Sequence, residues 1–211
     1  MQKRTGKEMG ALVLAALAAM LLVAGPAAAQ AENAAQPQGG AHGHSHAHDH
    51  DAAPAKGSAG AISKGYFEDG QIQDRTLADW QGDWQSVYPY LQDGTLDPVM
   101  AHKAEHGDKT ASEYRAYYDI GYRSDVTRIT IKGDQVSFYR GEAVVAGEYA
   151  NDGHETLTYE KGNRGVRYIF RKISGDAGAP QFIQFSDHAI APVKAGHYHL
   201  YWGKDRAALL N

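Results

Sequence analysis

The 211-residue sequence contains no cysteine, so it can form neither a disulfide nor a thiolate metal site. Any bound transition metal must therefore be held by histidine and carboxylate side chains, and the folded domain must be stabilised by its core. The sequence also has no excess of basic residues, because 21 Lys and Arg stand against 25 Asp and Glu, a formal net charge of −4. The composition lacks the excess of basic residues that is typical of nucleic-acid-binding proteins, and we expect no nucleic-acid partner.

A long apolar run is missing as well. Ala11–Val23 is apolar over 13 residues, whereas a transmembrane helix needs ~20. This run follows three basic residues and precedes Gly25-Pro26 and several alanines, an arrangement typical of an export signal. We expect residues 1–29 to be a cleaved signal peptide. Its removal takes away three basic residues and one acidic residue and changes the formal net charge from −4 to −6. With no cysteine available for a lipid anchor, we predict a mature protein that is free in the periplasm of a Gram-negative bacterium, or otherwise secreted, without stable membrane insertion.

Residues 30–60 are rich in Ala, Gly, Gln and Pro and have almost no large apolar side chains. Such a segment cannot bury enough surface to offset its ordering entropy, so we expect a disordered linker. Within it, His42–Asp51 carries five alternating histidines and two aspartates, which predicts a flexible tract that captures metal ions. A solvated tail and a cloning tag are the alternatives. Because binding must order a loose chain, we expect a lower affinity here than at a folded site.

Residues 61–211 have the length of one ordinary domain and read mainly as short strands separated by turns. Apolar and polar residues alternate on both sides of Gly133-Asp134, which predicts an antiparallel hairpin. We expect further strands at Ala143–Tyr149, ended by a turn at Asn151–Gly153, and at Val166–Phe170. This spacing favours a sandwich or a closed barrel.

Two helices are predicted before these strands. The first runs from Pro98 to His106 with Asp97 as N-cap, and the second follows the capping-box pattern Thr110–Glu113. The tyrosines of the second helix are expected to pack against the barrel. In the first helix, His102 to His106 matches H-x-x-E-H, the zinc motif of one class of proteases. The short, charged helix argues against catalysis, which leaves an accessory surface metal site or a solvated helix face.

Three histidines lie close together near the C-terminus. His197 and His199 are separated by one residue in an apolar and aromatic strand, so they share one face with Tyr201. His188 closes the preceding strand, and an intervening proline and glycine permit a hairpin that returns the chain to it. Three imidazoles that meet at one point suit tetrahedral zinc with one open position. The alternative is that these are structural histidines of the core or its rim.

The residues around these histidines also carry a resemblance. The matching motifs are Arg75–Trp80 (RTLADW), Trp84–Pro89 (WQSVYP), Gly165–Tyr168 (GVRY), Phe185–His188 (FSDH), Ala191-Pro192 and His197–His199 (HYH). In this combination, from Ile62 to Asn211, the chain resembles the ZinT family of periplasmic zinc-binding proteins. The resemblance implies a mainly β fold: a calycin- or lipocalin-like antiparallel β-barrel with a few short α-helices packed alongside. It also implies that Zn²⁺ is bound by His188, His197 and His199.

The resemblance further implies a metal buffer or metallochaperone that captures Zn²⁺ under zinc limitation, tolerates Cd²⁺ or other divalent metals, and assists the solute-binding protein of a zinc ABC importer. We expect a monomer that is not an enzyme. One alternative is a zinc hydrolase with the same three histidines, but no general base is evident, and Asp187 is expected to support a ligating imidazole. The other is a lipocalin-like binder of a small apolar ligand, which is disfavoured because the barrel interior is expected to present histidines.

Overall fold

The computed structural model describes residues 20–24 and 58–210, and for residues 20–24 it describes the backbone only. The strands are β1 (Met20–Ala24), β2 (Gly82–Ser86), β3 (Arg128–Lys132), β4 (Gln135–Arg140), β5 (Ala143–Thr158), β6 (Arg164–Gly175), β7 (Phe182–Ser186) and β8 (His197–Gly203). The helices are α1 (Ala59–Ser63), α2 (Tyr88–Gln92), α3 (Asp97–His106) and α4 (Ala111–Tyr122), with short 3-10 turns η1 (Asp69–Gln71), η2 (Leu77–Trp80) and η3 (Ala208–Leu210).

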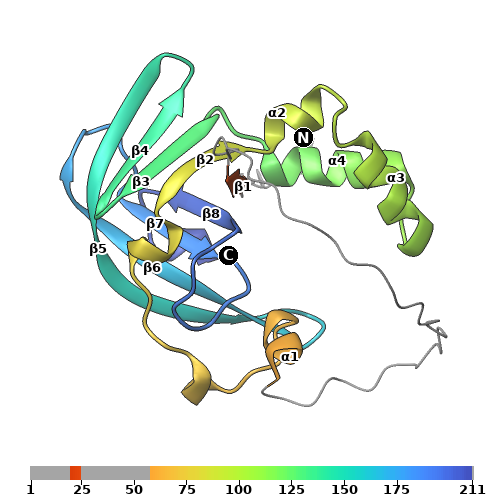
Figure 1. Ribbon diagram of the computed structural model, residues 1–211, viewed down its shortest axis with the longest axis horizontal. Coiled ribbons are helices and arrows are strands. Elements are labelled where there is room, and N and C mark those ends of the chain that lie inside the picture. Colours follow the sequence, from red (N-terminus) through yellow and green to blue (C-terminus); the bar gives the residue numbers. More distant parts are fainter. Residues whose placement is uncertain (1–19, 25–57, 211) are drawn as a thin grey trace, which may run out of the picture.

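Strands β2 to β8 pair in chain order, each antiparallel to the next, and form one strongly curled sheet (Figure 1). β1 lies antiparallel between β2 and β8 and closes the barrel. The predicted mainly β, calycin-like barrel with a few short helices is thus confirmed. β1 falls within the segment expected to be a signal peptide. If residues 1–29 are removed on export, β2 and β8 become the two edges of the curled sheet.

The core fills the inside of this curl. In the β3–β4 hairpin, Ile129, Ile131, Val136 and Phe138 are each at most 2% exposed, as the alternating pattern predicts. Burial of one such side chain contributes roughly 1.5–3 kcal/mol. Trp84 projects from β2 into the same core, and its indole nitrogen donates a hydrogen bond of 2.7 Å to the carbonyl of Trp80. Turn η2 thereby covers one end of the barrel.

Strand β5 corrects one prediction. The sequence Asn151–Gly153 was expected to be a turn between two strands, but β5 continues through it to Thr158 and stays paired with β6 on both sides. The register shifts between Asn151 and His154, so the extra residues form a β-bulge. Gly153 takes a φ of 85°, which glycine adopts without steric cost. These turn-forming residues bend the strand without ending it, because β5 pairs with β6 both before and after them.

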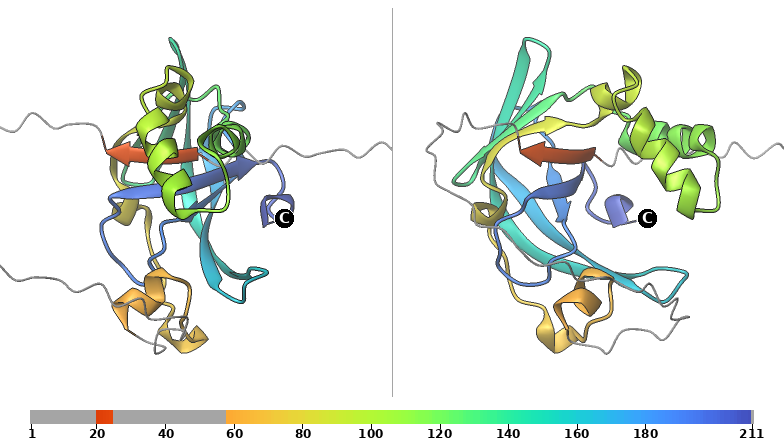
Figure 2. Two further views of the ribbon diagram at one scale, coloured as in Figure 1. Left: turned by 90° about the vertical axis from the view of Figure 1, so that its right-hand side faces the viewer. Right: turned by 45° about the vertical axis from the view of Figure 1, so that its right-hand side comes forward.

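Helices α2, α3 and α4 form an arm on one side of the barrel, while α1 lies on another side beside the far end of the β5–β6 hairpin (Figure 2). The predicted capping box is present, with Thr110 and Glu113 satisfying each other's backbone N–H groups. Helix α3 begins at Asp97, one residue before the predicted start at Pro98, and its N-cap is Leu96 in place of Asp97. The α4 tyrosines were expected to pack against the barrel, but only the end of α4 approaches it closely, where the Tyr122 ring lies 6.5 Å from that of His199. α4 has no buried residue, and Tyr117 is 63% exposed, because α4 packs mainly against α2 and α3.

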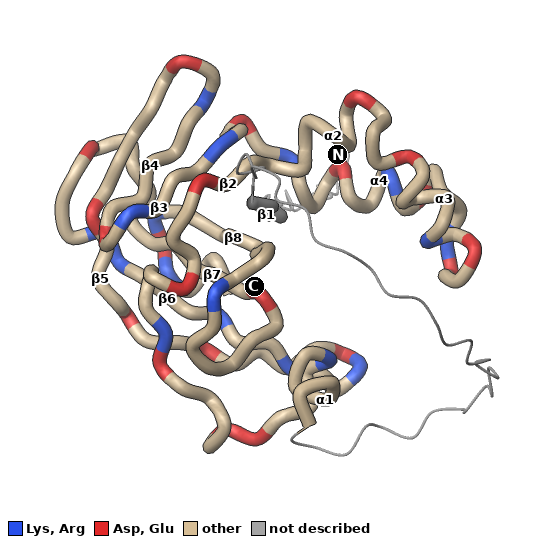
Figure 3. The backbone as a smooth tube through the Cα atoms, viewed as in Figure 1, with Lys and Arg blue, Asp and Glu red and all other residues tan. Residues whose placement is uncertain are grey.

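Charged residues of both signs are interspersed along the described chain (Figure 3). Among the described residues, no helix combines the length and the apolar character needed to cross a membrane.

Candidate metal centre

Strands β7 and β8 bring the three C-terminal histidines to one end of the barrel. The two strands are antiparallel, with Ser186 opposite His199 and Phe185 opposite Leu200. Tyr198 and Leu200 point into the core and are fully buried. His197 and His199 therefore lie on the other face of β8, as the alternation predicts. The expectation that the histidines face the barrel interior is wrong, because the larger apolar set of this strand occupies the interior.

His188 lies two residues beyond the end of β7 and faces the same end of β8. Its ring centre is 6.1 Å from that of His197 and 6.2 Å from that of His199. Three imidazoles on one tetrahedral zinc place their ring centres about 5 Å apart, given Zn–N bonds of ~2.1 Å. The rings thus need to approach one another by about 1 Å, a movement within reach of side-chain rotation alone. The structure brings together the three residues that the sequence analysis selected.

The backbone of His188 is unusual. Its φ is +66°, and among the described residues it is the one non-glycine residue with a positive φ. This left-handed conformation costs an L-residue roughly 1–2 kcal/mol, so the surrounding contacts must impose it. Strain of this kind is concentrated at functional sites. It turns the His188 ring toward β8 instead of letting the chain continue as a strand.

Arg75 holds the chain on the N-terminal side of this turn through Asp187, the residue directly before His188. Its guanidinium donates to both carboxylate oxygens of Asp187, at 2.6 and 2.9 Å, and to the carbonyl of Val193 at 2.9 Å. A third donor reaches Asp79 at 2.7 Å. Burial opposes the charged form of Arg75, but these hydrogen bonds raise its pKa overall. Both oxygens of Asp187 accept hydrogen bonds from Arg75, and Oδ1 also accepts one from the Ala189 N–H at 3.2 Å. Asp187 anchors the backbone next to His188.

His199 is held in the form that binds metal. Burial, followed by the neighbouring charges of His188, His197 and Arg167, lowers the pKa of His199 to about 4. A neutral imidazole is the ligand form, so this ring needs no deprotonation near neutral pH. The ring of Tyr122, at the end of α4, lies 6.5 Å from the His199 ring and limits its access to solvent. The helical arm thereby contributes one side of the candidate site.

Arg167 was missed by the sequence analysis. It projects from β6 on the same side as His199, is 7% exposed, and stacks with its guanidinium carbon 3.3 Å from the centre of the Tyr201 ring. Two of its nitrogens, Nε and Nη1, lack a hydrogen-bond partner, and burial lowers its pKa. The signal was present in the sequence, because Arg167 alternates with the apolar Val166 and Tyr168 and therefore lies on the opposite face of the strand.

A cavity of about 310 Å³ opens beside the site between α1 and the β5–β6 hairpin. Ser186 and His188 lie on its wall. His188 is therefore reachable from solvent on the side away from Tyr122, which provides a path for a metal ion. The predicted capture tract, His42–Asp51, lies outside the described residues.

Comparison with known proteins agrees with this architecture. Residues 58–211 match the sequence model of the family described as ZinT (YodA) periplasmic lipocalin-like zinc-recruitment. The probable metal-binding protein YrpE of Bacillus subtilis is 60% identical over 151 residues, which cover 71% of this chain and 60% of YrpE. The zinc-binding protein AdcA of Streptococcus pyogenes is 51% identical over 156 residues, which cover 72% of this chain and 30% of AdcA. The chain thus spans less than two thirds of these relatives.

Solved structures show the same fold. The crystal structure of the Zn(II)-bound ZinT-like domain of Streptococcus pneumoniae AdcA matches with a TM-score of 0.68 and 47% identity, covering 71% of this chain and 84% of that domain. The Zn(II)-bound structure of AdcA from the same organism matches with a TM-score of 0.69 and 46% identity, covering 73% of this chain and 34% of AdcA. With a family match over most of its length and relatives at this level of identity, the chain belongs to the ZinT family of lipocalin-like zinc-recruitment proteins.

Proposed function

We propose that this protein is an exported zinc-binding protein that captures Zn²⁺ with His188, His197 and His199 and passes it on. The observation that carries the proposal is the convergence of the three imidazoles at one end of β7 and β8, with ring centres 6.1 and 6.2 Å from His188. The left-handed backbone of His188 orients one ligand before the metal binds, and the lowered pKa of His199 keeps a second ligand in its neutral, metal-binding form. The zinc-bound structures of similar chains support this choice of metal.

The site suits binding better than catalysis. A zinc hydrolase needs a general base near the open coordination position. Asp187 is the carboxylate nearest to His188 in sequence, and it is engaged in a buried ion pair with Arg75. An open fourth position on an accessible site also favours release of the ion to an acceptor. Imidazole ligands do not discriminate strongly among borderline metals, so we propose that Cd²⁺ and other divalent ions bind at the same place.

We further propose that the acceptor is the solute-binding protein of a zinc ABC importer and that the protein acts as a monomeric buffer or metallochaperone under zinc limitation. Removal of residues 1–29 as a signal peptide would place it in the periplasm or outside the cell. In the AdcA proteins the matched region makes up 30% of a longer zinc-binding chain. That arrangement favours a function in which a domain of this kind works beside other parts of a zinc-binding protein.

Competition titration with a chromophoric zinc chelator tests the site. Replacement of His188, His197 or His199 by Ala should each weaken the tightest zinc class by at least about tenfold, the effect of losing ~1.4 kcal/mol of binding free energy. The matched control is His154→Ala, because His154 lies in the bulge of β5 and contacts Asp74 at 3.8 Å. If one of the three variants binds zinc as tightly as the control, that histidine is not a ligand.

A further inference from the structure

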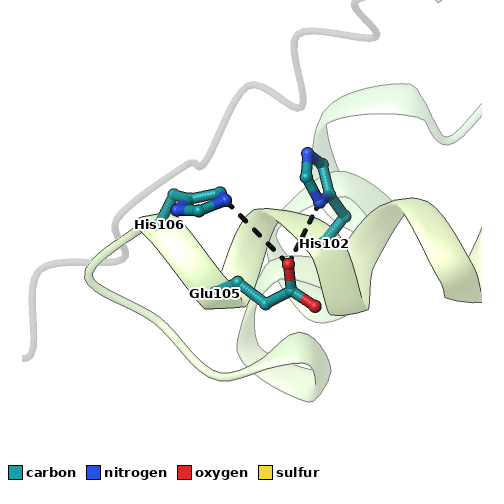
Figure 4. Close-up of side chains that lie close together, drawn as sticks. All are labelled: His102, Glu105 and His106. Carbon is teal, nitrogen blue, oxygen red and sulfur yellow. Dashed lines mark hydrogen bonds and ion pairs between the residues drawn. The ribbon is translucent and has the colours of Figure 1, made fainter. Parts of the chain in front are cut away.

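Helix α3 carries a second group of metal-binding side chains. His102, Glu105 and His106 occupy positions i, i+3 and i+4, so they lie on one face of the helix. Each offers one ligand atom, and these atoms all lie within 4.8 Å of one another. Within the described chain no other group of three or more such residues is gathered this closely. Figure 4 shows both histidine rings directed toward the Glu105 carboxylate.

The distances within this group suit a shared cation. Nδ1 of His102 lies 3.2 Å from Oε2 of Glu105, and Nε2 of His106 lies 3.9 Å from the same oxygen (Figure 4). The two ring centres are 5.2 Å apart, close to the separation of about 5 Å that two imidazoles take on one tetrahedral zinc. The side chains of the three residues are 73%, 65% and 75% exposed, so small rotations can bring the donors together without repacking.

We propose that His102, Glu105 and His106 form an accessory site for zinc or another borderline divalent cation, distinct from the barrel histidines. Two imidazole nitrogens and one carboxylate oxygen form a ligand set that zinc accepts, with water completing the tetrahedron. Exposed contacts of this kind contribute little to the stability of a helix. The three ligand atoms nevertheless lie within 4.8 Å of one another, which is the arrangement that a shared cation requires. The exposed position makes it a site of fast exchange and lower affinity than the barrel.

The position of α3 suggests what the site does. α3 packs on α4, and the last residue of α4, Tyr122, lies beside His199. Because its three side chains are largely exposed, the accessory site lies on the solvent-facing side of the same arm that borders the barrel site. It would gather cations at the surface and raise their local concentration near the tighter site.

The same motif in a protease would require a closed site that excludes water and holds a peptide. The side chains of His102, Glu105 and His106 are 65% to 75% exposed and are not enclosed in this way. α3 also ends at Gly107, directly after His106. The geometry therefore points to cation capture and not to catalysis.

Histidine labelling by diethyl pyrocarbonate tests the proposal on the full chain, because mass spectrometry of the peptides reports each histidine separately. We expect added Zn²⁺ to slow labelling of His102 and His106 over the same concentration range. In His102→Ala, zinc protection of His106 should disappear. In Glu105→Gln, the zinc concentration for half-protection should rise about tenfold, whereas the control Asp108→Asn, an exposed carboxylate outside the group, should not change it.

Circular dichroism of the variants checks that α3 remains folded. Unchanged zinc protection of His106 in His102→Ala would overturn the shared site, as would labelling of both histidines that is indifferent to zinc. The same protection is expected in a variant in which His188, His197 and His199 are all replaced by Ala. The result therefore does not depend on the proposed function of the barrel site, and failure of one proposal can be told from failure of the other.

Discussion

The guanidinium of Arg75 forms a bidentate pair with the carboxylate of Asp187, which lies 112 residues further along the chain and directly before His188. The Arg75 side chain is fully buried, and that of Asp187 is 4% exposed. Arg75 also lies over the ring of Trp80, with 4.1 Å between its guanidinium carbon and the ring centre. One ion pair thus ties the covering turn of the barrel to the backbone that presents a candidate zinc ligand.

Arg75→Met should therefore lower the free energy of unfolding by about 3–5 kcal/mol, because it leaves a buried carboxylate without its partner. Arg128→Met is the matched control. Arg128 pairs with Asp83 in the same bidentate geometry, but its side chain is 49% exposed, and such a surface pair contributes only ~0–1 kcal/mol. Urea unfolding of the two variants without metal measures the difference. Equal losses would mean that the buried pair has no special structural role.

The left-handed backbone of His188 leads to a prediction in which stability and metal binding separate. His188→Gly should be more stable than His188→Ala by ~1 kcal/mol, because glycine adopts a positive φ without steric cost. Both variants should lose tight zinc binding. At His197, in a strand with an ordinary backbone, the order should reverse, with the Gly variant ~0.5–1 kcal/mol less stable than the Ala variant. Thermal unfolding of the four metal-free proteins is the measurement. If the Gly variant is less stable than the Ala variant at both positions, the backbone of His188 is not strained.

Much of the fold follows from short-range patterns in the sequence. The β3–β4 hairpin is predictable because alternating side chains separate a core face from a solvent face over both strands. The same alternation placed His197 and His199 on one face of β8. It did not decide which face is the interior, although Tyr198 and Leu200 are the more apolar pair and are the ones buried. Burial of the larger apolar surface decides the orientation of the strand.

Features that depend on distant partners were beyond the reach of these patterns. Asn151–Gly153 has the composition of a turn, and only the presence of β6 beside it makes it a bulge. The role of Asp187 depends on Arg75, which no local pattern connects to it. The strain at His188 likewise results from contacts made by the folded chain. The convergence of the three histidines at one end of the barrel was predictable, but the contacts that hold the backbone there were not.

The pKa of His199, lowered to about 4, predicts a pH dependence of stability. Between about pH 6.5 and pH 4 the unfolded chain binds a proton at this histidine and the folded protein does not. The free energy of unfolding of the metal-free protein should therefore fall as the pH falls through this window and recover as it rises. His199→Gln should remove this component, whereas the control His154→Gln should keep it. Urea unfolding at several pH values between these limits measures it.

The same property predicts how protons compete with zinc. A ligating histidine that is already neutral releases no proton when the metal binds. Since His199 is neutral down to about pH 4, it should release no proton when zinc binds, so the three-histidine site should release at most two. The logarithm of the affinity plotted against pH should have a slope of no more than about two between roughly pH 5 and 7.5. A slope of three would show that His199 is protonated before binding. Potentiometric and competition titrations give this slope.

The final prediction concerns the His-rich tract and the barrel. His42–Asp51 precedes α1 by a few residues rich in alanine and glycine, and a flexible chain of n residues spans roughly 5–6 Å × √n. We predict two classes of zinc binding, one tight site in the barrel and weaker sites in the tract. Deletion of residues 30–60 should remove weak binding, slow metal capture at low zinc, and leave the tight class largely intact. Because the Ser58 hydroxyl caps α1 by accepting a hydrogen bond from the Ala61 N–H, a deletion of residues 30–57 that keeps this cap is the control for effects on the fold. Calorimetry and competition titration of the full chain and both deletions decide the question. Loss of tight binding in both deletions would make the tract a ligand-bearing part of the primary site and would contradict the three-histidine site.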